Sequence, residues 1–145
     1  MKVVVDASII MDAYTTTLGS DANRRSIALI EAIMDGSVQA YAPDHFSVEC
    51  ANAGRKYQQR NRKVITMQDT LQFFEAMREF PIQLCTMVLD AHRCASWAYA
   101  FNCSAYDAVY VELARMLDAQ VATCDGGMAT ACRNFEVPLW KPPIK

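Results

Sequence analysis

The chain has 145 residues, of which 52% are hydrophobic and 21% are charged, and its formal net charge is −2. This length and composition are typical of one globular domain, residues 1–145, and exclude a disordered chain. No apolar run approaches the roughly 20 residues of a membrane span, and no signal-peptide pattern opens the chain, so we expect a cytoplasmic protein with no membrane partner. The near-neutral charge neither supports nor excludes a nucleic-acid partner.

The first predicted element is a short strand formed by three consecutive valines at residues 3–5. A β-branched run that is apolar on both faces is typical of a strand at the centre of a parallel sheet. Asp6 follows directly, and Ser8 comes just before an apolar pattern that begins a helix. Asp6 therefore either caps that helix or lies in the crevice beyond the strand ends, where α/β sheets bind ligands.

The rest of the chain alternates helices with short strands. Residues 15–20 are predicted as a loop, and a helix then ends at Gly36. Strands are predicted at residues 38–42, 82–85, 120–123 and 137–139, the last as an edge strand, with helical patterns between them. This alternation predicts an α/β fold with a mainly parallel sheet of about five strands, flanked by helices on both faces.

Four acidic residues stand at or near the starts of predicted elements: Asp6, Glu49, Asp107 and Asp125. In a doubly wound sheet these positions can all face the crevice at the carboxyl ends of the strands. Several carboxylates in one place are the ligands that Mg²⁺ and Mn²⁺ take, and such ions support phosphodiester hydrolysis. The pattern therefore favours a metal site.

Each acid also has a purely structural interpretation. Asp107 can form a capping box with Ser104, Asp125 can serve an Asp-Gly turn, and Glu49 can be a solvated helix residue. Asp69 sits in the same capping pattern as Asp107, and we assign it no catalytic role. His45 and His92 stand apart from other ligand types, and the six cysteines form no C-x-x-C pair, so we expect no zinc site.

Together these motifs resemble the PIN-domain ribonucleases, most closely the VapC-type toxins of prokaryotic toxin–antitoxin modules. The likeness covers almost the whole chain. It rests on Val5-Asp6-Ala7-Ser8, Val48-Glu49-Cys50-Ala51-Asn52, Tyr106-Asp107-Ala108 and Thr123-Cys124-Asp125, in this order and spacing. Gly54 and the Gly126-Gly127 pair depart from the usual family pattern.

The resemblance implies a function, a cofactor and partners. The four acids would hold Mg²⁺ or Mn²⁺ for endoribonuclease cleavage of RNA, as the toxin of a type II toxin–antitoxin pair. Ser8 and Thr123 match hydroxyl residues that support the site, and Asn52 matches a residue near the glutamate. The resemblance also implies a homodimer, and inhibition by a cognate antitoxin that inserts a segment into the active-site groove.

A basic segment follows Glu49 and is a candidate RNA contact. Arg55, Lys56 and Arg60 lie in a stretch without acids between Cys50 and Gln68. Lys56 lies seven residues after Glu49, two helical turns along nearly the same face. The alternative is a solvated helix end whose cations complement the helix dipole.

Other α/β proteins with acids at strand ends fit less well. A receiver domain needs adjacent acids after the first strand, a haloacid-dehalogenase-type phosphatase needs D-x-D, and a dinucleotide-binding fold needs G-x-G-x-x-G. The chain has Asp6-Ala7-Ser8 at that place. The alternative that stays open is a PIN-fold module that is catalytically weak or inactive and binds RNA or a protein partner.

Overall fold

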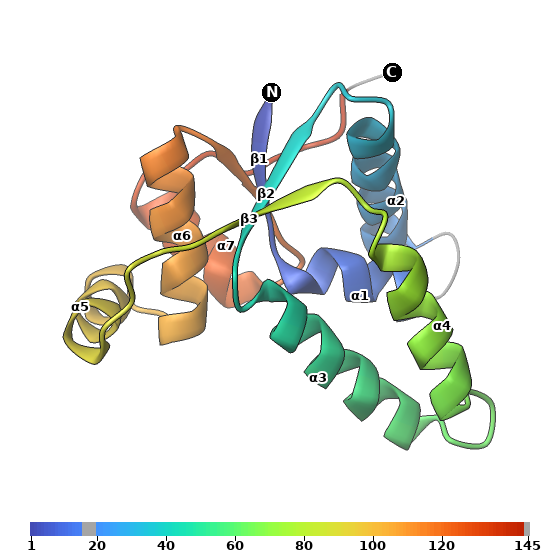
Figure 1. Ribbon diagram of the computed structural model, residues 1–145. Coiled ribbons are helices and arrows are strands. Elements are labelled where there is room, and N and C mark those ends of the chain that lie inside the picture. Colours follow the sequence, from blue (N-terminus) through green and yellow to red (C-terminus); the bar gives the residue numbers. More distant parts are fainter. Residues whose placement is uncertain (16–19, 144–145) are drawn as a thin grey trace.

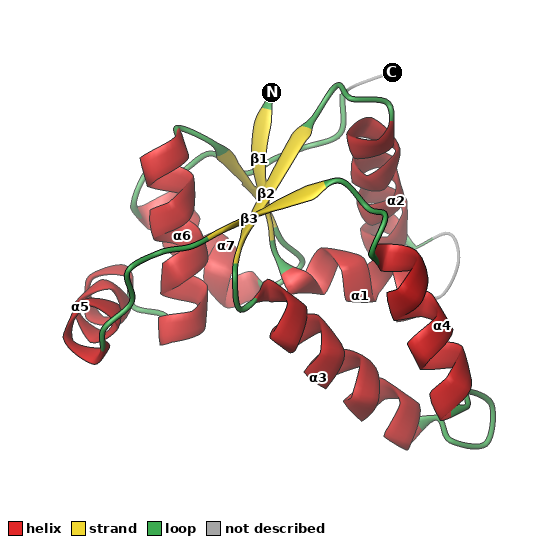
Figure 2. Ribbon diagram, in the orientation of Figure 1, coloured by secondary structure: helices red, strands yellow, loops and turns green. Residues whose placement is uncertain are grey.

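The computed structural model describes residues 1–15 and 20–143, in which four strands and seven helices follow one another (Figures 1 and 2). The strands are β1 (Lys2–Val5), β2 (Gln39–Pro43), β3 (Ile82–Cys85) and β4 (Gln120–Ala122). The helices are α1 (Ala7–Thr15), α2 (Asp21–Met34), α3 (Phe46–Arg60), α4 (Met67–Met77), α5 (Ala91–Phe101), α6 (Ala105–Leu117) and α7 (Gly126–Asn134). The loop predicted at residues 15–20 falls mainly on residues 16–19, outside the described part of the chain.

β1 lies at the centre of the sheet, as the valine run predicts. The strand order is β3-β2-β1-β4, and all three pairings are parallel. Val3 pairs with Ala40 on one side, and Val4 pairs with Val121 on the other. Because parallel strands end at the same edge of a sheet, the residues after β1, β2 and β4 are brought to one edge.

Helices cover both faces of β1. Val4 belongs to the larger core cluster, which includes Phe46 of α3 and Tyr110 of α6. Val3 and Val5 point to the other face and pack in a second cluster with Leu29 of α2. In Figure 1, α6 and α7 lie on one side of the strands and α2 lies on the other. No helix among the described residues has both the length and the apolarity that a membrane crossing requires.

The predicted sheet of about five strands was wrong, because the sheet has four. Residues 137–139 form only an isolated bridge between Leu139 and Val121, in which Val121 N–H donates to the Pro138 carbonyl and Trp140 N–H donates to the Val121 carbonyl, both at 2.8 Å. In a parallel ladder alternate N–H groups face the same neighbour, so the adjacent donors toward β4 would come from residues 138 and 142. Both are prolines, which lack an N–H, and the ladder therefore stops after one bridge.

Gly54 lets α3 and α4 approach each other closely. It is buried in the middle of α3, which continues to Arg60, and a Cβ at this position would lie 2.6 Å from Cζ of Phe74 on α4. A larger side chain would displace the Phe74 ring. The glycine at this position therefore has a packing reason.

Candidate functional site

Asp6 is held at the end of β1 by two hydroxyl groups. The Thr123 hydroxyl donates to Asp6 Oδ2 at 2.7 Å, and the Ser8 hydroxyl donates to the same oxygen. Each hydroxyl is itself oriented by a backbone N–H, that of Asp125 on Thr123 Oγ1 and that of Cys124 on Ser8 Oγ, both at 2.9 Å. The side chain of Asp6 is therefore fixed in direction by the hydroxyls of Ser8 and Thr123.

Burial disfavours a charge on Asp6. Only 5% of the residue is exposed, and burial raises the pKa of its carboxyl above the usual value. The two hydroxyl hydrogen bonds oppose this rise in pKa, and the nearby charge of Glu49 adds to it. An ionised Asp6 would therefore be stabilised by any cation that reached it.

Glu49 lies in the first turn of α3 and contacts His45, for which the sequence predicted no role at the site. Its Oε1 atom is 2.7 Å from Nε2 of His45, four residues earlier. The ring of His45 also packs edge-on against Tyr110, with centroids 5.2 Å apart. Neither Oε1 of Glu49 nor Nε2 of His45 has a well-aligned hydrogen bond within the described residues, although both atoms are buried. The spacing of four residues in a helix was the sequence signal for this pair.

The start of α6 distinguishes Asp107 from its capping control, Asp69. At α4 both halves of the capping box form: Thr66 Oγ1 accepts the Asp69 N–H at 3.1 Å, and the Asp69 carboxylate accepts the Thr66 N–H at 2.8 Å. At α6 the Ser104 hydroxyl accepts the Asp107 N–H at 3.1 Å. Ser104 and Asp107 are both within the described residues, and the Asp107 carboxylate does not accept a hydrogen bond from the Ser104 N–H there. The Asp107 carboxylate is therefore not committed to the backbone cap.

The surroundings of Asp107 make its charge unfavourable. Burial raises the pKa of this carboxyl from 3.8 to about 6, with further contributions from the charges of Asp125, Asp6 and Glu49, against a hydrogen bond from Ser104. A half-buried acid surrounded by other acids is characteristic of functional sites more than of helix caps.

Asp125 caps a helix, where the sequence predicted an Asp-Gly turn, and it also lines the acidic cavity. It is the N-cap of α7, where its Oδ1 accepts the Met128 N–H at 2.7 Å. Its own N–H donates to Thr123, so the cap and the support of Asp6 form one connected network. Capping and a place at the site are therefore compatible for this residue.

The four predicted acids meet at one cavity of about 260 Å³. It is lined by Asp6, Ala7, Ser8, Met11, Glu49, Ala53, Asp107 and Asp125. These residues include no Lys, Arg or His among the described part of the chain, so the cavity is strongly negative. The field reaches the Cys50 thiol, whose pKa rises to about 12, mainly through burial and then through Asp6 and Glu49. Asn52 does not line this cavity.

The chemistry of this donor set fits a hard divalent cation. Carboxylate oxygens are the ligands that Mg²⁺ and Mn²⁺ take, and the buried Oε1 of Glu49 lacks an aligned hydrogen bond from the described residues. Within the same residues, no three His, Cys, Asp or Glu side chains are grouped tightly enough to form a finished metal site. The carboxylates thus share a cavity, and they would have to move closer together to coordinate one ion.

A second cavity of about 260 Å³ adjoins the acidic one. Its lining is Met11, Thr15, Ala53, Lys56, Tyr57 and Arg60, so the two cavities share Met11 and Ala53. Of the three predicted RNA-contacting residues, Lys56 and Arg60 lie here, and Arg55 does not. The structure therefore places a positive cavity directly beside the negative one.

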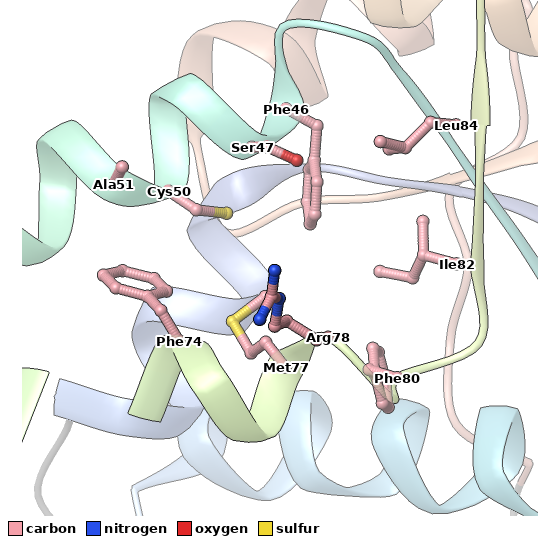
Figure 3. Close-up of a pocket in the computed structure, with 10 residues that line it drawn as sticks. All are labelled: Phe46, Ser47, Cys50, Ala51, Phe74, Met77, Arg78, Phe80, Ile82 and Leu84. Carbon is pink, nitrogen blue, oxygen red and sulfur yellow. The ribbon is translucent and has the colours of Figure 1, made fainter. Parts of the chain in front are cut away.

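A third pocket lies between α3, α4 and β3 and is of a different kind (Figure 3). Its volume is about 390 Å³, and its lining is Phe46, Ser47, Cys50, Ala51, Phe74, Met77, Arg78, Phe80, Ile82 and Leu84. Arg78 is the single charged side chain among these residues. The pocket suits apolar groups, and its lining includes no carboxylate for a hard cation.

Two solved structures share this fold. PAE2754 from Pyrobaculum aerophilum matches with a TM-score of 0.65 and 13% sequence identity, over 90% of this chain and 79% of that one. FitAcB from Neisseria gonorrhoeae matches with a TM-score of 0.55 and 15% identity, over 97% of both chains. No protein-family model matches the chain, and no curated protein matches its sequence. At these identities the likeness shows a related fold.

Proposed function

We propose that this chain is a Mg²⁺- or Mn²⁺-dependent endoribonuclease, acting in the cytoplasm as the toxin of a type II toxin–antitoxin pair. The VapC-type PIN-domain ribonucleases, which its motifs resemble, are the class to which we assign it. The observation that carries the proposal is the cavity lined by Asp6, Glu49, Asp107 and Asp125, which come from four separate parts of the chain. The related fold of PAE2754 and FitAcB is compatible with it.

The residues of the cavity have distinct tasks in this proposal. A divalent ion, when bound, would activate water and stabilise the leaving oxygen of an RNA phosphodiester. Ser8 and Thr123 both donate to Oδ2 of Asp6, so they would hold this carboxylate in place when it binds the cation. His45 contacts Glu49 and limits the directions in which that carboxylate can turn. Asp107 and Asp125 would complete the negative charge that holds the cation.

Cleavage of a single-stranded RNA in millimolar Mg²⁺ or Mn²⁺ tests this function. We expect cleavage that stops in EDTA and is lost in Asp6→Asn, because the substitution removes a fixed charged ligand. Asp118→Asn is the matched control. Asp118 is the C-cap of α6 in the left-handed conformation, which Asn also adopts readily, and Asp118 does not line the cavity.

The alternative is a module of the same class that binds RNA or a protein partner without cleaving. It is favoured by one observation, the lack of a tight group of three metal-ligating side chains among the described residues. RNA binding without any metal-dependent cleavage would support this alternative. Equal cleavage by the parent protein and Asp6→Asn would contradict the assignment of the acidic cavity.

Lys56 and Arg60 are proposed to bind the RNA backbone as it enters the acidic cavity. On an Asp6→Asn background, Lys56→Ala with Arg60→Ala should weaken RNA binding most at low salt. Each lost phosphate contact should make the slope of log affinity against log salt shallower by about 0.7 for a single strand. Fluorescence anisotropy with a labelled RNA at several salt concentrations measures it.

The matched control replaces two cations of the same segment outside that cavity, Arg62→Ala with Lys63→Ala. It changes the net charge equally, so a difference between the two double variants reports position and not overall charge. An identical salt slope in the two double variants would mean that Lys56 and Arg60 belong to a solvated helix end and do not contact the RNA.

The protein partners remain part of the proposal. A cognate antitoxin and a second copy of this chain are the partners that the sequence resemblance implies. The apolar pocket of Figure 3 supports a protein partner, because it lies beside α3 on the surface and would accept apolar side chains. Leu84, on the outer strand β3, is 45% exposed at its rim.

A further inference from the structure

His45 stands at the start of α3, where helix formation does not require a histidine. It occupies the N-cap position, yet its side chain makes no capping hydrogen bond among the described residues. At α7, in contrast, the side chain of Asp125 accepts the capping hydrogen bond, as acidic and hydroxyl residues commonly do. The imidazole of His45 instead lies along the helix toward Glu49, with Nε2 at 2.7 Å from Oε1.

The ring of His45 is held from the neighbouring helix α6. The fully buried ring of Tyr110 meets it edge-on, with centroids 5.2 Å apart and an interplanar angle of 79°. The side chain of His45 is only 20% exposed. Because an edge-to-face contact favours one relative orientation of the two rings, the direction in which Nε2 points is set by Tyr110 as well as by Glu49.

The contact between His45 and Glu49 is close but incomplete. Nε2 and Oε1 are within hydrogen-bond distance, yet neither atom has an aligned hydrogen bond from the described residues, and both are buried. Buried polar atoms without such a bond cost free energy. Since the distance is already short, a turn of the Glu49 carboxylate would be enough to align the two groups.

We propose that His45 is a positioning residue for Glu49, whose Oε1 accepts the Nε2–H of His45 when a divalent cation is bound, so that Oε2 faces the acidic cavity. This inference rests on the proposed function and concerns the same site. Glu49 lines that cavity and His45 does not, so His45 acts through Glu49 and not as a ligand. The role requires a proton on Nε2 and no bond from His45 to the ion.

Metal affinity tests the proposal without any RNA. His45→Phe keeps an aromatic ring against Tyr110 but has no donor, and it should weaken Mn²⁺ binding in isothermal titration calorimetry about tenfold or more, the usual cost of losing a group that orients a metal ligand. His45→Gln places an amide N–H the same number of bonds from the backbone and should restore most of the affinity. His92→Gln, at an exposed position of α5, is the control that should bind like the parent protein.

Nuclear magnetic resonance gives a signature that a packing role alone would not produce. The chain has two histidines, so in ¹⁵N-labelled His92→Gln protein all imidazole signals belong to His45. Addition of Mg²⁺ should make the Nε2 proton of His45 exchange more slowly with water and shift its signal, because the hydrogen bond to Glu49 becomes aligned. The same protein with Glu49→Gln should not show this response.

Several outcomes would overturn the positioning role. These are equal Mn²⁺ affinity of His45→Phe and the parent protein, a loss in His45→Gln as large as that in His45→Phe, or a metal-loaded protein whose His45 proton is on Nδ1. Thermal unfolding in EDTA checks that each variant is folded. If His45→Phe does not fold, the response of the His45 signal to Mg²⁺ decides by itself.

These results separate the positioning role from the ribonuclease function. If the parent protein binds metal and cleaves RNA while His45→Phe binds metal equally well, only the positioning role fails. If the His45 signal responds to metal but no RNA is cleaved, only the ribonuclease function fails. In a cleaving protein, His45→Phe should need more metal for half-maximal cleavage and reach the parent kcat at saturating metal. A parent protein that binds no metal counts against both.

Discussion

Asp107→Asn is expected to abolish RNA cleavage and, in the absence of metal, to stabilise the folded protein. The folded state raises the pKa of the Asp107 carboxyl from 3.8 to about 6, chiefly through burial and then through Asp125. At neutral pH the folded protein therefore holds a charge that the unfolded chain carries at lower cost. Asparagine keeps the shape and local hydrogen bonding of the side chain but removes that charge.

The pH dependence of this gain has a definite sign. Between pH 3.8 and about 6 the folded state binds a proton that the unfolded state has released, so the stability of the unsubstituted protein falls as pH rises through this window. Above this pH window, the pKa difference corresponds to a loss of about 3 kcal/mol in the free energy of unfolding. Solvent screening at a half-buried group reduces this loss to about 1–2 kcal/mol. Urea unfolding in EDTA at pH 7.5 and pH 4.5 measures it, with the larger gain expected at pH 7.5.

Asp69→Asn is the matched control for Asp107→Asn. Asp69 is exposed, completes the capping box with Thr66, and has a pKa lowered by those hydrogen bonds. Its substitution should leave cleavage intact and destabilise the protein, the opposite of Asp107→Asn in both respects. If Asp107→Asn also retains cleavage and loses stability, Asp107 is a structural cap.

The central strand and the meeting of the acids could be predicted from the sequence because both depend on local patterns. A run of three valines indicates a strand buried on both faces, and parallel topology then brings the residues that follow such strands to one edge. The predicted strand at residues 82–85 has the bounds of β3. The hydroxyls of Ser8 and Thr123 reach Asp6 for the same reason, since both lie next to strand ends.

Two features depend on tertiary placement: residues 137–139 form only a bridge, and the ring of His45 contacts Tyr110. Two prolines flank Leu139 in the sequence, but only the register against β4 determines that their missing N–H groups are the ones a ladder would need. His45 stands four residues before Glu49, yet its ring contact is with Tyr110 of α6, a residue far away in the sequence. Neither arrangement is contained in a local pattern.

Helix geometry explains the outcome for the basic segment. Lys56 and Arg60 are four residues apart and share a face of α3, and both line the cavity beside the acids. Arg55 is rotated by about 100° from Lys56 around the helix, so it points elsewhere. The sequence predicted a basic segment, and the helical period selects which of its members face the site.

Divalent metal is expected to raise the melting temperature of the protein by several degrees. The carboxylates of the acidic cavity repel one another, and burial raises the pKa values of Asp6 and Asp107 in the folded state. A cation that binds only the folded protein removes this repulsion. At a free concentration of about 100 times its Kd it adds about 2.7 kcal/mol. For a domain of this size that corresponds to a rise of roughly 5–10 °C.

Thermal unfolding in Mg²⁺ or Mn²⁺ against EDTA, compared between the parent protein and an Asp6→Asn, Asp107→Asn double variant, tests the metal site without relying on activity. The double variant should be more stable than the parent in EDTA, because its cavity has lost two repelling charges, and it should gain little from metal. We predict a rise of several degrees in the parent protein that the double variant does not share. No rise in the parent protein at millimolar metal, or an equal rise in both, would contradict a metal site formed by these four carboxylates.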